Sequence, residues 1–211
     1  MKKLPDSKSY FDHVAPRWDA MRMGFFSETV REKAFSAADI QSGKLAADIG
    51  AGSGFITEGL IQRNVRVIAV DQSKAMLEVM NKKFADHPGI QYRVSTADTL
   101  PVADDTVDHA FANMYLHHVE TPAAAIREMV RILKPGGKLV VTDLDAHDFT
   151  FLKDEHFDRW PGFERPDIHR WLTEAGLKNV SVDCAGEDCC TRSTCGAVLA
   201  QISIFLASGV K

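Results

Sequence analysis

The sequence predicts an α/β fold in which a mostly parallel sheet lies between layers of helices. Short apolar runs typical of buried strands alternate along the chain with stretches of helical periodicity. The first such run ends in an acid, Asp48, and glycines follow at alternate positions, Gly50, Gly52 and Gly54, as in a buried strand that turns tightly into a helix. With 211 residues, of which 45% are hydrophobic, the chain can bury one sizeable core. We therefore predict a single domain over residues 1–211.

Composition and charge disfavour several kinds of partner. The formal net charge of −4 gives no general attraction to nucleic acid. No apolar run reaches membrane-spanning length, and the lysines near the start of the chain are not followed by an apolar segment. We expect a cytoplasmic monomer or homodimer with no nucleic-acid or membrane partner.

The glycine turn at 50–54 is predicted to bind a ligand. Glycines adopt backbone angles that side chains forbid, so a ligand can lie against bare peptide before Phe55 begins the next helix. The G-x-G-x-G spacing departs from the dinucleotide pattern G-x-G-x-x-G, and Asp48 would repel a pyrophosphate. A ligand with a cationic centre and no phosphate would instead be attracted by that carboxylate.

Before the turn, residues 1–40 are predicted to form an N-terminal helical cover, since Val30, Ala34 and Ala37 recur at helical spacing. After the turn, a second strand over 65–70 ends in Asp71, 17 positions beyond Gly54. At about this spacing a strand-end carboxylate accepts hydrogen bonds from ribose hydroxyls. The alternative, a cap for the following helix, is weaker because Ser73 is the better N-cap.

Three further strands are predicted over 90–94, 107–113 and 138–142, with a helix from Pro122 between the last two. The strand over 107–113 opens into a loop with Tyr115 and two histidines, and the strand over 138–142 delivers further acids and a histidine to the same edge. Because catalytic residues in open parallel sheets gather at the carboxyl ends of strands, the two loops are expected to frame the substrate. A lone histidine is usually structural, whereas His117 and His118 in tandem favour a site.

Residues 146–165 mix aromatic and charged side chains without a clean period and are predicted to form a lid or insertion. His156, Asp158 and Trp160 are able to reach inward from it. A helix then begins at Pro166, and the last two strands are predicted over 180–184 and 198–207, joined by a loop that carries the cysteines.

The four cysteines, Cys184, Cys189, Cys190 and Cys195, all lie in one stretch near the end of the chain. They are either small apolar residues of a reduced protein or a thiol group that binds a soft metal or metalloid. Zinc knuckles of the C-x2-C type are absent, and no metal is included in the predicted site. We hypothesise that Cys189 and Cys190 both face the substrate.

The chain resembles class I S-adenosylmethionine-dependent methyltransferases, in particular small-molecule enzymes of ubiquinone and menaquinone biosynthesis. The resemblance covers about residues 10–204 and rests on D-I-G-A-G-S-G at 48–54, Asp71, the pair Ala97-Asp98 and L-K-P-G-G-K-L at 133–139. It implies a Rossmann-like sheet of seven strands with the last strand antiparallel, and S-adenosylmethionine as the cofactor. This cofactor has a positive sulfonium and a positive ammonium group, which agrees with an acid at position 48.

The resemblance also implies site residues and a reaction. Methyl transfer to a small molecule is an in-line displacement that needs a base only when the nucleophile carries a proton. The first segment would fold over the cofactor and substrate through Tyr10, Phe11 and Trp18. The candidate catalytic residues are Tyr115, His117, His118 and His147, and the candidate cofactor-binding residues are Asp48, Gly50, Ala51, Gly52, Gly54, Asp71, Gln72, Met76, Ala97, Asp98 and Asn113.

Two other functions remain open on the sequence. One is a non-catalytic module that binds S-adenosylmethionine or a soft metal. The other is a nicotinamide-dependent reductase, which the glycine spacing and Asp48 disfavour.

Overall fold

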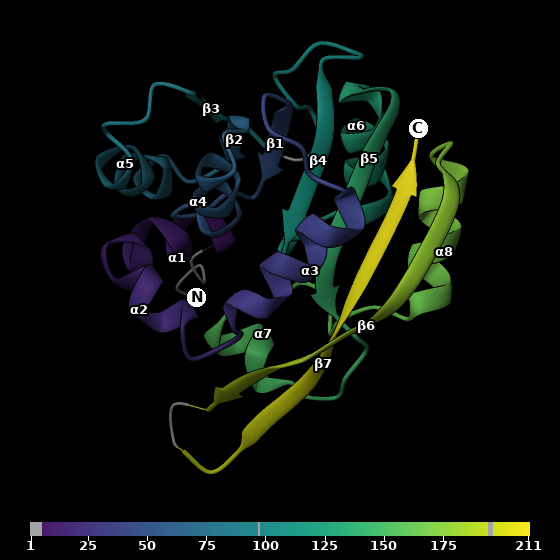
Figure 1. Ribbon diagram of the computed structural model, residues 1–211. Helices are drawn as coiled ribbons and strands as arrows, with labels where there is room; N and C mark the ends of the chain where they lie inside the picture. The colour runs from purple at the N-terminus through teal and green to yellow at the C-terminus, as the bar shows by residue number, and fades with distance from the viewer. Residues whose placement is uncertain (1–5, 97, 194–195) are drawn as a thin grey trace.

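The computed structural model describes residues 6–96, 98–193 and 196–211, and within them it contains a seven-stranded sheet of order β3-β2-β1-β4-β5-β7-β6 (Figure 1). The strands from β3 to β5 in this order run parallel, while β7 is antiparallel to both β5 and β6. The predicted fold class is confirmed. The strands are β1 Leu45–Ile49, β2 Arg66–Asp71, β3 Ile90–Val94, β4 Val107–Asn113, β5 Leu133–Leu144, β6 Lys178–Arg192 and β7 Leu199–Val210.

Helices cover both faces of the sheet, because alternate residues of a strand point to opposite sides. Ala46 packs in the hydrophobic core under one group of helices, and its neighbour Ala47 packs in the core under the other group. Figure 1 shows α3 on the near side of the sheet and α6 beyond it. The first group is α3 Glu28–Ala38, α4 Phe55–Gln62 and α5 Lys74–Lys83, and the second is α6 Pro122–Ile132 and α8 Arg165–Glu174.

Local sequence signals set the ends of these helices. Ser73 caps α5 by accepting a hydrogen bond from the Met76 N–H at 3.1 Å, as expected, and Pro122 is the first residue of α6. After α8, Gly176 takes a φ of +97°, which a side chain would disfavour. In the part of the chain that the structure describes, no helix combines the length and apolarity needed to cross a membrane.

The first part of the N-terminal segment lies over the carboxyl ends of the strands, whereas α3, which the predicted cover 1–40 included, packs on one face of the sheet. This first part consists of α1 Ser7–Val14, a 3₁₀ turn Ala15–Arg17 and α2 Trp18–Arg22. The Ser73 hydroxyl donates to a carboxylate oxygen of Asp12 at 2.6 Å, and Val14 and Ala15 pack against Met76. These contacts attach the cover to the start of α5.

The predicted strand limits are wrong near the C-terminus. β6 continues through Cys184 to Arg192 and β7 begins at Leu199, so residues 185–192 lie in a strand and not in a loop. Past the main sheet the two strands pair only with each other and form a projecting two-stranded ribbon, visible below β5 in Figure 1. The polar residues of this stretch conceal the strand pattern, because a ribbon exposed on one side needs few apolar residues. β5 also begins earlier than predicted, at Leu133, which pairs with Val107 before a register shift.

The hypothesis that Cys189 and Cys190 both face the substrate is wrong. Adjacent residues of a strand point to opposite faces of the ribbon. Cys189 is buried and lines a pocket, while the backbone N–H of Cys190 donates to the Phe25 carbonyl oxygen at 2.9 Å. This hydrogen bond ties the ribbon to the N-terminal cover. Cys195 lies outside the described residues.

The predicted lid, residues 146–165, is irregular apart from the short helix α7 Phe151–Glu155. It leaves β5 and returns beside it, since Asp145 forms a β-bridge with Phe163. The backbone N–H groups of Arg159 and Trp160 donate to the His117 carbonyl oxygen at 2.9 and 3.1 Å. The segment is thereby held against the loop that follows β4.

Candidate functional site

The glycine turn and the loop after β4 lie at the point where the strand order reverses, between β1 and β4. Open α/β sheets bind ligands in the crevice at such a point. The N–H groups of Gly50 and Ala51 both donate to the Val70 carbonyl oxygen, at 2.9 and 3.1 Å. A Cβ atom on Gly50 would lie 2.2 Å from the Tyr115 ring, and the φ of Gly50 is +69°. Only glycine fits this position.

A cleft at this crevice gathers most of the predicted cofactor residues. It encloses about 650 Å³, counting the part open to solvent. The predicted residues that line it are Asp48, Gly50, Ala51, Gly52, Asp71, Gln72, Met76, Asn113, Tyr115 and His118.

Two nearly buried carboxylates stand at the floor of the cleft. Burial raises the pKa of Asp48 to about 7, although Thr57 donates to it from its N–H at 3.0 Å and its hydroxyl at 2.6 Å. Burial likewise raises the pKa of Asp71 to about 6, against hydrogen bonds of 2.8 Å from the N–H groups of Ser73 and Gly52. Removal of both carboxylates from water favours binding of a ligand that offers positive charge or hydroxyl donors.

Other predicted cofactor residues lie beside the cleft or behind it. Asp98 lines a neighbouring hollow together with Gln72 and His118. Gly54 faces the side chains of Phe84 and Met80 and begins α4 with a φ of +96°, so its role is to close the turn. Ala97 lies outside the described residues.

The sequence did not point to Arg22, which also lines the cleft. Its guanidinium carbon lies 4.3 Å from the centre of the Phe55 ring, and its Nε is buried with no hydrogen-bond partner among the described residues. A buried N–H without a partner is costly, so this group suits an anionic part of a ligand. Arginine on a short helix of mixed composition gives no sequence signal for such a role.

A second, largely apolar pocket of about 500 Å³ adjoins the cleft. Met114 lines both spaces, and its φ of +51° is an unfavourable backbone conformation for a residue with a long side chain. The residues shared by the two spaces are Phe11, Trp18, Phe26, Met114 and His118. The pocket is completed by Tyr10, Phe25, His117, Leu144, Leu152, His156, Asp158, Cys189 and Thr191.

The pocket contains a buried histidine whose orientation is fixed by a carboxylate. His117 Nδ1 lies 2.6 Å from Asp143 Oδ1. Asp143 Oδ2 accepts hydrogen bonds from the N–H groups of Tyr115 and Leu116 at 3.1 and 2.8 Å. Burial lowers the pKa of His117, but the negative charges of Asp143 and Asp158 outweigh it and raise the pKa to about 9.

The neighbouring histidine is the opposite case. Burial and the charge of His117 hold the pKa of His118 well below its ordinary value, so its imidazole is neutral near pH 7. His118 borders the cleft and the pocket, and its ring meets Phe11 edge to face at 5.0 Å between ring centroids. A neutral imidazole at the junction of two ligand spaces is able to accept a proton.

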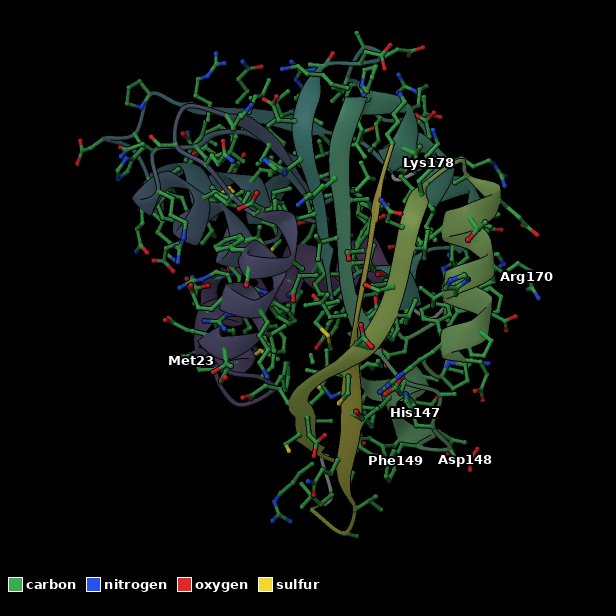
Figure 2. All side chains as sticks on the ribbon, turned by 45° about the vertical axis from the view of Figure 1, so that its right-hand side comes forward. Met23, His147, Asp148, Phe149, Arg170 and Lys178 are labelled. Carbon is green, nitrogen blue, oxygen red and sulfur yellow. The ribbon has the colours of Figure 1, made fainter. Side chains whose placement is uncertain are left out.

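His147 does not join this group. It lines a separate hollow formed by residues 147–161, and its Nδ1 accepts a hydrogen bond from the Phe149 N–H at 3.2 Å. In Figure 2 His147, Asp148 and Phe149 lie on one side of the β6–β7 ribbon and Met23 lies on the other. The chain turns away from the sheet after Asp145, so the strand end no longer aims the His147 side chain at the crevice.

Comparison with known proteins agrees with this geometry. The family model described as a methyltransferase domain matches residues 47–141. The chain is 33% identical over 148 residues to the demethylmenaquinone methyltransferase of Paenarthrobacter aurescens, covering 68% of this chain and 57% of the relative. It is 30% identical over 189 residues to the demethylmenaquinone methyltransferase of Thermobifida fusca, covering 81% of this chain and 78% of the relative.

The fold is also that of solved methyltransferases. A chain in the complex of the Haloferax volcanii Trm112 methyltransferase activator with a methyltransferase superposes with a TM-score of 0.78, at 19% identity over 99% of both chains. The present chain spans 41%, 57% and 63% of the length of three curated relatives, so these matches describe a shared domain. With its glycine turn, its strand-end acids and its likeness to the Thermobifida enzyme over most of both chains, the protein belongs to the class I S-adenosylmethionine-dependent methyltransferases.

Proposed function

We propose that the protein transfers the methyl group of S-adenosylmethionine to a hydroxyl group of a small aromatic acceptor bound in the second pocket. The observation that carries this proposal is the junction of the two spaces at Met114 and His118. A cofactor in the cleft and an acceptor in the pocket would meet there.

The cleft supplies a partner for each part of the cofactor. Asp71 would accept hydrogen bonds from the ribose hydroxyls and Asp98 from the adenine amino group, with Gln72 and Met76 beside them. Arg22 would bind the carboxylate, and Asp48 would attract the positive charge of the methionine part. Residues on β1, β2, β4 and the N-terminal cover would thus hold the sulfonium methyl at the junction.

The pocket suits a flat and mostly apolar acceptor. Aromatic rings of the cover form one wall, with Tyr10 and Phe11 5.3 Å apart and Phe11 and Trp18 also 5.3 Å apart between ring centroids. The polar groups concentrate on the wall formed by His117, His118 and Asp158. The relatives from Paenarthrobacter and Thermobifida are named demethylmenaquinone methyltransferases, and a quinone is a flat, mostly apolar acceptor of the kind that such a pocket suits.

The reaction needs alignment and the loss of one proton. The acceptor oxygen forms a bond to the methyl carbon while the carbon–sulfur bond breaks, and the electron pair of that bond goes to sulfur. Holding the three atoms in line contributes on the order of 7–11 kcal/mol. The hydroxyl proton would leave at the wall formed by His117, His118 and Asp158, and the aromatic cover would exclude water.

The test is release of S-adenosylhomocysteine by the purified protein with four classes of acceptor: hydroquinones, catechols, monophenols and thiols. We expect product formation with the hydroxyl-bearing aromatics and a mass gain of one methyl group in the product. A protein that binds S-adenosylmethionine but releases no S-adenosylhomocysteine with any class would be a non-catalytic binding module. If only thiols were methylated, the acceptor atom would be sulfur and the proposed hydroxyl acceptor would be wrong.

A further inference from the structure

Three side chains on one wall of the second pocket place potential metal ligands close together. His117 Nε2 and His118 Nδ1 each lie 3.8 Å from Asp158 Oδ1, and all three atoms lie within 4.8 Å of one another. Ligands bound to one ion at about 2.1 Å in tetrahedral geometry are about 3.4 Å apart. Small side-chain shifts would therefore bring the three atoms onto a common ion.

His117 has the environment of a metal ligand. Its Nδ1 lies 2.6 Å from Asp143 Oδ1, so the carboxylate fixes the ring, and an ion bound at Nε2 would take the place of the proton there. Three backbone N–H groups donate to the other oxygen of Asp143, which keeps this carboxylate fixed. A carboxylate behind a histidine is the usual arrangement at protein metal sites, because it orients the ring and increases the basicity of the ligand nitrogen.

Asp158 is a buried carboxylate whose positive partner is not close. It is 6% exposed, and the His117 and His118 nitrogens nearest to its Oδ1 lie 3.8 Å away, too far for a hydrogen bond. A buried carboxylate without close donors is unfavourable. A divalent ion would replace the His117 proton as its positive partner and would bind the carboxylate at a shorter distance.

His118 would give up little to coordinate an ion. Its Nδ1 contacts the Phe157 carbonyl oxygen at 3.4 Å, which is long for a hydrogen bond. The lid turns tightly at Phe157, whose φ is +62°, and Asp158 follows directly. This turn is what brings the Asp158 carboxylate onto the histidine pair.

We propose that His117, His118 and Asp158 bind one divalent transition-metal ion, with its remaining coordination positions open to the acceptor pocket. Two imidazoles and one carboxylate suit Zn²⁺ or Fe²⁺, whereas Mg²⁺ and Ca²⁺ prefer oxygen ligands alone. All three residues line the pocket, so a fourth ligand would come from solvent or the acceptor. The sequence prediction contained no metal, because the ligands lie on segments 40 residues apart and show no ligand spacing.

In its chemistry the inference deepens the proposed function and rests on it. An acceptor hydroxyl that displaces a water molecule from the ion would give its proton to that departing water, and the oxygen would remain on the ion as an anion. Its lone pair would then form the bond to the methyl carbon as the carbon–sulfur bond breaks. The ion would thereby select acceptors that place a hydroxyl at this wall.

Metal binding is tested without cofactor or acceptor. Purified full-length protein, stripped with a chelator and dialysed, is titrated with Zn²⁺ against a chromophoric chelator, and Mg²⁺ is titrated in parallel. We expect one Zn²⁺ per chain and no competition by Mg²⁺. Asp158→Asn and His118→Gln should each weaken Zn²⁺ binding by more than about tenfold. His169→Gln, which changes an exposed histidine on α8, is the matched control and should bind as the unchanged protein does.

Co²⁺ gives a second readout that does not depend on affinity. Substitution at a site of low coordination number should give visible absorption that is lost in Asp158→Asn, while circular dichroism shows that the variant is folded. Binding that is absent, or equal in Asp158→Asn and His169→Gln, would overturn the metal site and leave methyl transfer standing. If the protein binds one Zn²⁺ per chain but methylates no acceptor, the metal site stands and the proposed function is overturned.

Discussion

Asp48 and Asp71 end two adjacent parallel strands and are only 2% and 9% exposed. Each has hydrogen bonds within the protein, yet burial raises both pKa values. The burial of an ionised carboxylate is unfavourable by itself and becomes favourable when a ligand brings positive charge or hydrogen-bond donors to it. The cofactor should therefore interact with these two groups in different, measurable ways.

The affinity for S-adenosylmethionine is expected to depend on pH through Asp48. A positive ligand favours the ionised carboxylate, so binding strengthens as the pH rises through the pKa of about 7. Between pH 8 and pH 6 we expect a loss of up to about tenfold, measured by calorimetry. Asp48→Asn should remove this dependence; a variant with the same slope would assign it to another group.

The same group affects the stability of the unliganded protein. An unfolded aspartate titrates near 4, so between about pH 4 and pH 7 the folded state holds a proton that the unfolded state has released. Stability should therefore fall as the pH rises through this window. Asp48→Asn should unfold at a higher temperature than the unchanged protein at pH 8, and the difference should shrink toward pH 4.

Asp71→Asn should weaken S-adenosylmethionine binding by tenfold or more with the fold retained. Each hydrogen bond to a charged acceptor contributes about 1.5–3 kcal/mol, and the amide keeps the size of the side chain but can accept from only one of the Gly52 and Ser73 N–H groups. Calorimetry gives the dissociation constant, and Asp148→Asn, at an exposed position, is the control. An unchanged dissociation constant would remove Asp71 from the cofactor site.

Arg22→Gln separates the carboxylate of the cofactor from its nucleoside. If the buried guanidinium binds the carboxylate, the variant should bind S-adenosylmethionine several-fold more weakly and 5′-methylthioadenosine, which lacks the amino-acid part, equally well. Competition calorimetry measures both. Equal weakening of both ligands would mean that Arg22 acts only by packing on Phe55.

At the scale of elements, the β6–β7 ribbon extends the sheet beyond the rim and contributes one wall of the second pocket. Cys189 and Thr191, two residues apart on one face of β6, both line that pocket. Cys184, near the base of the ribbon, is exposed. Its Sγ accepts a hydrogen bond from the Gly186 N–H at 3.2 Å and lies 3.4 Å from the Ser203 Oγ, where either atom can donate. The three described cysteines thus occupy three different environments.

These environments predict an order of reaction with iodoacetamide. Hydrogen bonds from Ser203 and Gly186 lower the pKa of Cys184, while burial raises the pKa of Cys189 to about 12. Peptide mass spectrometry of the native protein should show Cys184 labelled more than about tenfold faster than Cys189. Faster labelling of Cys189 than of Cys184 would mean that the ribbon opens. As a control, Cys184→Ser should abolish the fast labelling reaction and leave the slow labelling of Cys189 unchanged.

At the scale of the whole molecule, the N-terminal cover closes both ligand spaces at once. Phe11 lines the cleft and the pocket and packs edge to face on Trp18 and His118. Cofactor and acceptor binding should therefore be coupled through the cover, because either ligand favours the closed arrangement that the other needs.

Phe11→Ala should weaken cofactor binding and raise the KM for the acceptor together. The stabilisation that a saturating ligand gives, about 2.7 kcal/mol at one hundred times its dissociation constant, should shrink at fixed S-adenosylmethionine concentration. Thermal unfolding with and without cofactor measures it. Met23→Ala, at a position 69% exposed on the same cover and labelled in Figure 2, is the control. A change in only one of the two constants would exclude coupling by Phe11.

The sequence by itself determined the layered fold, the glycine turn and the acids Asp48 and Asp71. These follow from signals within a few residues: the alternation of apolar runs, backbone angles that require glycine, and an acid at a strand end. Their positions follow from the sheet, since parallel strands bring their carboxyl ends to one edge.

Only the tertiary structure decided which distant side chains join that edge. Asp158 reaches the histidine pair because the lid is held to the His117 carbonyl oxygen, and Arg22 reaches the cleft because α1 is attached to α5. The same packing directs His147 away from the site and makes a strand of the cysteine segment. Contacts between residues far apart in sequence depend on how whole elements pack, and no local pattern of residues encodes that packing.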